Sequence, residues 1–161
     1  MAVLAVDAQV HHMGGGVKVT GPAHQADTFY GGAILFALAV GTTGKVSCVP
    51  TSGTSERVLG ICSKKQIITA ADQPVEYHRG GVFLFPAVAS IAATDIGSFL
   101  VADKSGTISD NPLDLVSSVD ITPVTGDCVV GQIIGMDASS NLIVDCSLMG
   151  LNLTVTTLAL Q

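Results

Sequence analysis

The sequence contains no tryptophan, few other aromatic residues and few charges of either sign. Aromatic residues make up 4% of the 161 positions and charged residues 12%, with 7 Lys and Arg against 13 Asp and Glu. A free-standing nucleic-acid binder needs clustered Lys and Arg to neutralise phosphates, so this shortage argues against that class. No apolar run approaches the roughly 20 residues of a membrane span, because the longest, residues 33–40, has eight. We therefore expect neither nucleic acid nor a membrane among the partners.

Targeting signals and paired cysteine motifs are also missing. The first residues lack a basic region, and their apolar stretch ends at Asp7, so no signal peptide is predicted. Cys48, Cys62, Cys128 and Cys146 include no pair at C-x-x-C spacing, which gives no support to a zinc site or a dithiol redox motif. We expect reduced, largely buried thiols in a protein made in a cytoplasm, although four cysteines also allow a disulfide pair.

The chain is rich in residues that favour strands. Val, Ile and Thr number 45, whereas Glu, Lys and Arg number only 9. β-Branched side chains suit a pleated surface, and soluble helices usually need charged helix formers on their outer face. Gly and Pro separate short apolar runs along the whole sequence. The pattern predicts a mainly-β domain with few or no helices, with strands at residues 16–20, 33–39, 45–49, 57–63, 74–78, 82–85, 99–102, 107–109, 128–136 and 142–147.

Two stretches of the sequence share a layout. Residues 32–35, 44–47 and 58–61 are echoed by residues 97–100, 106–109 and 129–132, and each copy ends in one more strand. The last element of each echo has a glycine in mid-strand, which marks a bulge or a close approach of backbones. Two such halves, residues 32–79 and 97–147, would curl into one small barrel. The alternative is the chance similarity that glycine-rich β sequences produce.

The two ends of the sequence differ from its middle. Residues 1–28 combine small apolar residues, two histidines and three successive glycines, which favours an extended N-terminal arm that becomes ordered on a partner. Residues 29–161 would then form a single domain, and removal of residues 1–13 would leave that domain folded. Leucines alternate with polar residues after residue 150, a strand pattern that needs a partner within the subunit or across an interface.

Charge is distributed unevenly along the chain. Up to Lys104 there are 7 basic and 7 acidic residues, whereas from Ser105 onward there are 6 aspartates and no basic residue. Such a segment is either a solvated face without a partner or a surface that avoids other anionic surfaces.

No catalytic constellation emerges, so we expect no enzyme and no cofactor. Residues 41–46 look faintly like a phosphate loop but lack its first glycine and its final Ser or Thr. His11 and His12 are adjacent, and neighbours in an extended chain point to opposite sides, which makes a poor metal chelate. We therefore predict no metal site.

A characteristic order of glycines and apolar strands runs between about residues 27 and 147. It comprises residues 27–35, 44–46, 57–61, 74–77, 79–83, 97–101, 130–133 and 142–144. This order resembles that of the small β-rich capsid cement, or head decoration, proteins of tailed bacteriophages. The resemblance implies a compact, tulip-like β-barrel that sits as a homotrimer on the outside of a mature head.

This resemblance gives a set of expectations about partners and sites. The partners would be the major capsid protein and further copies of this chain, and the location would be the outer capsid surface of a virion. The alternatives are a capsid fibre base or another virion structural subunit, or, from a different class, a β-barrel ligand- or carbohydrate-binding module. The expected capsid-contact residues in the arm are Val3, Leu4, Val6, Val10, His11, His12 and Met13, and the expected subunit-interface residues are Tyr77, Phe83, Phe85, Leu151 and Leu153.

Overall fold

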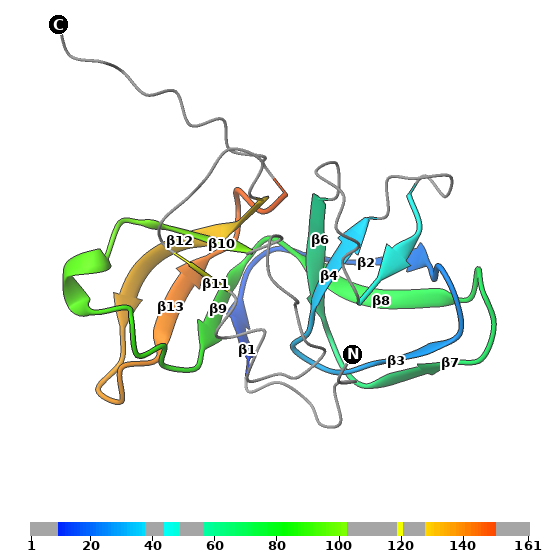
Figure 1. Cartoon of the computed structure of the whole chain (residues 1–161), viewed down its shortest axis with the longest axis horizontal. Coiled ribbons are helices and arrows are strands. Elements are labelled where there is room, and N and C mark those ends of the chain that lie inside the picture. Colours follow the sequence, from blue (N-terminus) through cyan, green and yellow to red (C-terminus); the bar gives the residue numbers. More distant parts are fainter. Residues whose placement is uncertain (1–9, 38–43, 49–56, 103–118, 121–127, 151–161) are drawn as a thin grey trace, which may run out of the picture.

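The computed structural model describes residues 10–37, 44–48, 57–102, 119–120 and 128–150. In these ranges the chain is mainly β, as the composition predicts, and the one helical element is the short turn η1 (Ala93–Asp95). The strands form three antiparallel sheets, of six, five and two strands (Figure 1). Their bounds are β1 (His11–Gly14), β2 (Val17–Pro22), β3 (Asp27–Phe29), β4 (Ile34–Ala37), β5 (Val46–Ser47), β6 (Arg57–Cys62), β7 (Gln66–Ile68), β8 (Pro74–Arg79), β9 (Val82–Phe85), β10 (Phe99–Ala102), β11 (Val119–Asp120), β12 (Cys128–Met136) and β13 (Leu142–Asp145).

The five-stranded sheet curls until its two ends meet. Its strand order is β2-β8-β6-β4-β5, and Ala23, just after β2, forms a parallel bridge with Val46 in β5. The backbone N–H of His24 donates to the carbonyl of Val46 at 2.9 Å. Strands β3 and β7 pair with each other as a separate two-stranded sheet. We call this barrel-like part, residues 17–79, the first lobe.

The six-stranded sheet, in the order β1-β9-β13-β12-β10-β11, forms the second lobe. Apart from β1, its strands all follow those of the first lobe in the sequence. The predicted strand at residues 107–109 lies outside the described residues, and the strand that pairs with the outer side of β10 is β11.

The stretches that echo each other in sequence have the same strand order and register. β4, β5, β6 and β8 of the first lobe correspond to β10, β11, β12 and β13 of the second. Leu35 lies opposite Gly60, and Leu100 lies opposite Gly131; in both ladders the register shifts directly afterwards. A backbone hydrogen bond just before the first strand of each unit is repeated too. It runs from Gly32 N to Cys62 O at 2.8 Å in the first lobe and from Gly97 N to Ile133 O at 2.7 Å in the second.

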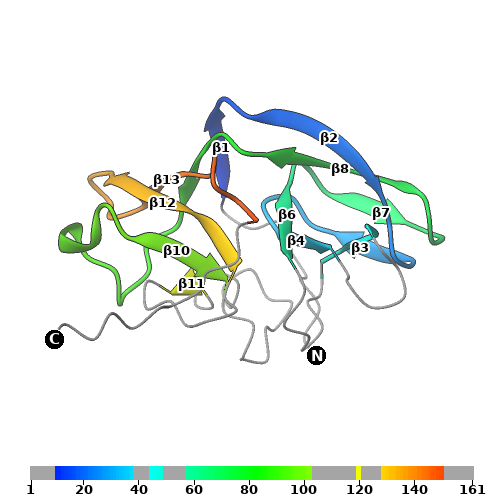
Figure 2. The same cartoon turned by 90° about the horizontal axis from the view of Figure 1, so that it is seen from above.

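A long two-stranded ribbon joins the lobes. β1 continues into β2, and β8 continues into β9. These two continuous segments run antiparallel to each other from one lobe to the other (Figure 2). The ribbon bends at glycines 14–16 and 80–81, all of which have a positive φ, and at Gly16 and Gly81 a Cβ would also meet the opposite backbone. Gly16 has a φ of +68°, and a Cβ there would lie 2.4 Å from the carbonyl oxygen of Gly80. Only glycine combines this backbone conformation with so close an approach.

The described part of the expected N-terminal arm differs from that expectation. Residues 11–29 contribute β1, β2 and β3, which pair with β9, β8 and β7. Residues 10–28 are therefore part of the sheets in this chain, because the ribbon partner supplies backbone hydrogen bonds that the isolated sequence does not reveal. Residues 1–9 lie outside the described residues.

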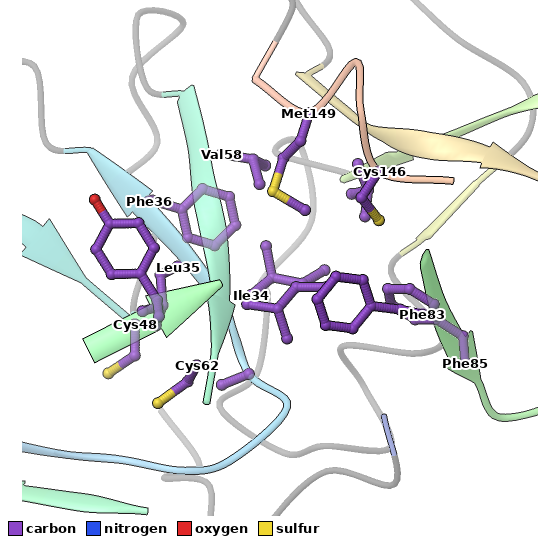
Figure 3. Close-up of a cluster of buried hydrophobic side chains, with 14 of the residues drawn as sticks. Ile34, Leu35, Phe36, Cys48, Val58, Cys62, Phe83, Phe85, Cys146 and Met149 are labelled. Atoms are coloured by element: carbon purple, nitrogen blue, oxygen red, sulfur yellow. The ribbon is translucent and has the colours of Figure 1, made fainter. Parts of the chain in front are cut away.

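One buried cluster contains side chains from both lobes (Figure 3). It includes Ile34 and Val58 of the first lobe and Phe83, Cys146 and Met149 of the second. A hydrogen bond also crosses between the lobes, from Val58 N to the Cys128 sulfur at 3.1 Å. All four cysteines are buried thiols, as expected for a reduced protein.

Three of the expected interface residues are core residues instead. Phe83 and Phe85 are 1% exposed and Tyr77 is 7% exposed. They belong to the cluster that both lobes share, so they do not present a contact surface to another subunit. The alternation of apolar residues in β9 does not distinguish a strand buried by its own chain from one buried by a neighbour. Leu151 and Leu153 lie outside the described residues.

Candidate functional site

A cleft of about 340 Å³ lies where the two lobes meet beside the ribbon. We call it the interlobe cleft. The second lobe contributes the start of β1 and one residue of β9, and the first lobe contributes the turn before β4, the end of β6, the segment after it and one residue of β8. The lining residues are Val10, His11, His12, Gly31, Gly32, Ile61, Cys62, Ser63, Lys64, Lys65, His78 and Phe83.

Two histidines from different strands stack at this cleft. The His12 and His78 ring centroids are 4.1 Å apart with an interplanar angle of 23°, and the His12 ring lies 5.0 Å from that of Phe83. His12 reaches this position because it pairs with Phe83 across β1 and β9, next to the bend of the ribbon. Its Nε2 lies 2.9 Å from the Gly15 carbonyl oxygen, so this nitrogen donates a proton to that oxygen.

The surroundings of His78 favour its neutral form. Burial lowers the pKa of His78, and the nearby His12 and Lys18 lower it further, whereas Glu76 acts in the opposite direction. At neutral pH the stacked rings therefore have an uncharged member, which removes the repulsion that two imidazolium rings would feel.

Glu76 on β8 organises the cations next to the cleft. Its carboxylate lies 3.2 Å from the Lys18 ammonium and 3.9 Å from that of Lys64. It also accepts a hydrogen bond from the Ser63 hydroxyl at 2.9 Å. The Ser63 hydrogen bond is the main cause that lowers the pKa of Glu76, followed by Lys18. Glu76 is thus an anion that is already shared between two lysines.

Gln66 holds the lysine-bearing segment against β8. Its side-chain amide donates to the carbonyl of Glu76 at 2.8 Å, and its side-chain oxygen accepts from the Glu76 N–H at 2.8 Å. The Lys65 ammonium lies 5.1 Å from the centre of the Tyr30 ring, a cation–π arrangement. Among the described residues Lys65 has no carboxylate within ion-pair distance.

The cleft therefore gathers basic side chains in an acidic protein. Three of the chain's 4 histidines and two of its 7 Lys and Arg line it. Carboxylates and phosphates are the groups that ammonium and imidazole donors bind best. Within the described ranges no group of three His, Cys, Asp or Glu is placed to hold a metal ion. The chemistry that the arrangement offers is the binding of an anionic group.

The structure brings part of the expected arm site together and leaves the rest apart. Val10, His11 and His12 border the cleft, and Val10 also packs against the core. Met13, 56% exposed, is not among the lining residues of the cleft. Val3, Leu4 and Val6 lie outside the described residues.

Sequence reasoning missed His78, Lys64 and Lys65 as members of a site. The one available signal was Lys64-Lys65, the only pair of adjacent basic residues in the sequence. His12, which lines the same cleft, is 52 positions from Lys64 in the sequence. Only the ribbon and its bend bring the two regions together.

The comparisons with known proteins gave no match. No protein-family model, no curated protein and no solved structure matches this chain. Among the described residues, no helix has the length and apolar character to cross a membrane.

Proposed function

We propose that this protein is a structural virion protein that binds the outer surface of a phage capsid as a homotrimer and stabilises the head. The observation that carries the proposal is the repeated β unit. Two sheets of the same register are fused through one buried core, and this gives a rigid body that holds itself together without any partner. A protein whose task is adhesion needs such a body and needs no reactive group.

The outer surface of this body offers apolar contact points. Ile96 and Ile134 are 46% and 50% exposed, and they flank the hydrogen bond from Gly97 to Ile133 at one end of the second lobe. Ile67 on β7, in the first lobe, is 70% exposed. Exposed large apolar side chains on a surface with little charge are typical of protein contact regions.

The segment before β1 is the proposed capsid-contact arm. β1 is an edge strand of the six-stranded sheet, and residues 1–9, with Val3, Leu4 and Val6, precede it. In a homotrimer three such arms would bind one shell together. The second and third arms then bind at a high effective concentration, which multiplies the affinity without any new type of contact.

The test uses heads assembled from the major capsid protein that is encoded with this chain. Purified protein is mixed with heads that lack it, and the heads are sedimented. We expect saturable co-sedimentation with the heads and none with unassembled capsid protein. Heads that carry no bound protein at saturating concentration would contradict the proposal.

The interlobe cleft is the one observation that favours the alternative, a ligand- or carbohydrate-binding module. Sugars usually stack on exposed aromatic rings, whereas Phe83, which lines this cleft, and Tyr30, which lies under Lys65, are 1% and 9% exposed. Glycan-array binding by a protein of monomeric mass would support this alternative over the capsid function.

A further inference from the structure

The basic and acidic residues of this chain are separated from each other. All 7 Lys and Arg occur up to Lys104, and the rest of the sequence has 6 aspartates without a single basic residue. At the interlobe cleft, Lys64, Lys65 and three histidines face one space. The molecule thus has a cationic concavity and a separate anionic stretch of sequence.

Two described aspartates of the acidic part, Asp137 and Asp145, are used within their own loops. Asp137 accepts from the backbone of Ser139 and Asn141 at 2.8 and 2.9 Å. Asp145 accepts from the N–H of Ser147 at 2.9 Å. These carboxylates cap turns of the second lobe, so they are poor candidates for binding a second surface.

The remaining aspartates lie in residues 105–127. This stretch has four, Asp110, Asp114, Asp120 and Asp127, and no basic residue. It therefore has four negative charges over 23 positions, in a chain that has few charges elsewhere. It is the most anionic stretch of the sequence and is complementary to the cleft.

We propose that the interlobe cleft receives carboxylates of residues 105–127 from a second copy of this chain. The contact joins two different surfaces, a cleft on one copy and an acidic segment on the next, so it is a head-to-tail contact. Head-to-tail contacts close into rings when the rotation between copies allows it. The inference rests on the proposed function in that it supplies the contact that builds the homotrimer.

The cleft has the charge and the size for this role. Lys64 shares Glu76 with Lys18 at the long distance of 3.9 Å, and Lys65 has no carboxylate partner among the described residues. The volume of the interlobe cleft, about 340 Å³, is at the lower end of the range of ligand sites, about 300–1,000 Å³. A carboxylate entering between Lys65 and the stacked histidines meets the Lys65 ammonium, which lies over the Tyr30 ring, on a segment that Gln66 holds against β8.

The experiment measures molar mass by size-exclusion chromatography with light scattering, on the full chain at several concentrations. The wild type is expected as an oligomer whose mass is a multiple of 16.3 kDa. The variant Lys64→Glu/Lys65→Glu is expected to dissociate, with a dissociation constant raised about a hundredfold or more. A wild type of monomeric mass, or a variant of unchanged mass, would overturn the inference.

A matched control changes the same amount of charge elsewhere. Lys45→Glu/Arg57→Glu alters two basic residues outside the cleft: Lys45, which is half-buried and paired with the exposed Asp72, and Arg57, which is exposed at the start of β6. This control is expected to stay oligomeric. If it dissociates as far as the cleft variant, the effect comes from net charge and the inference fails. Circular dichroism checks that each variant is folded, and Lys64→Gln/Lys65→Gln provides a milder version.

A charge exchange identifies the occupant. Asp110→Lys/Asp114→Lys alone is expected to dissociate the oligomer, and combination with Lys64→Glu/Lys65→Glu is expected to restore it. Failure of the fourfold variant to regain mass would show that residues 105–127 are not the occupant. Head binding is measured separately, because a wild-type trimer that binds heads and whose mass the cleft variant leaves unchanged would remove this inference and leave the proposed function standing.

Discussion

At the scale of single residues, two glycines occupy equivalent positions in the two lobes. A Cβ on Gly60 would lie 2.4 Å from the carbonyl oxygen of His78, and a Cβ on Gly131 would lie 2.5 Å from that of Asp145. In each lobe the neighbouring strand thus approaches more closely than any side chain allows. The sequence echo contained both glycines, so this feature was visible before the structure, but the atoms that they approach were not.

We expect Gly60→Ala and Gly131→Ala each to lower the free energy of unfolding by about 1–3 kcal/mol, because the added methyl group displaces backbone. The control is Gly135→Ala in β12, where the nearest atom would lie 3.7 Å from the new Cβ. Urea denaturation of the three variants measures the effect. Equal stability of all three would show that the strands are not packed as closely as described.

The stacked histidines make stability depend on pH. The pKa of folded His78 is lowered, mainly by burial, so the unfolded chain, with a histidine pKa near 6.5, takes up the proton first. The stability that neutral His78 contributes is complete above about pH 6.5, and it is lost as the pH falls below that value. The lowered pKa of Glu76 acts only in more acidic solution, where carboxylates titrate.

Thermal unfolding measured between pH 7.5 and pH 5 tests this expectation. The melting temperature of the wild type should fall over this interval, and that of His78→Asn should fall less. NMR titration of the His78 ring should give a value below that of an exposed histidine. A melting temperature that does not change with pH in the wild type would contradict the account.

At the scale of elements, the strands that coincide with an apolar run were predictable, and those without such a run were not. β6, β8, β9, β12 and β13 stand within a residue or two of their predicted bounds because apolar residues between glycine or proline breaks define them. β1, β3 and β7 have three or four residues each and no clear alternation. They are strands because a neighbour pairs with them, which is information that lies elsewhere in the chain.

Strand β1 also changes what truncation should do. It pairs with β9, and the His12 ring lies 5.0 Å from that of Phe83, which is 1% exposed. Deletion of residues 1–9 is expected to leave the melting temperature unchanged. Deletion of residues 1–13 is expected to lower the free energy of unfolding by about 1–3 kcal/mol, in contrast to the expectation from sequence alone.

Both truncations are expected to abolish binding to heads, since both remove Val3, Leu4 and Val6. Circular dichroism, thermal unfolding and co-sedimentation are measured on the same samples. Full head binding after deletion of residues 1–9 would show that the arm is not the attachment element.

At the scale of the whole molecule, the sequence echo predicts the architecture better than it predicts the partners of individual strands. The echo paired residues 44–47 with 106–109, whereas β11, at 119–120, corresponds to β5. Spacing alone cannot place a two-residue strand after a long connection. The interlobe cleft was equally hidden, because its residues come from five separate stretches of the sequence, which the bend of the ribbon brings together.

The most direct test of the central claim is the temperature at which DNA-filled heads rupture, measured by release of DNA with and without this protein. We expect the bound protein to raise that temperature in a saturable manner, and Gly135→Ala, which leaves the fold intact, to do the same. An unchanged rupture temperature on heads shown to be saturated with the protein would contradict a stabilising role on the capsid.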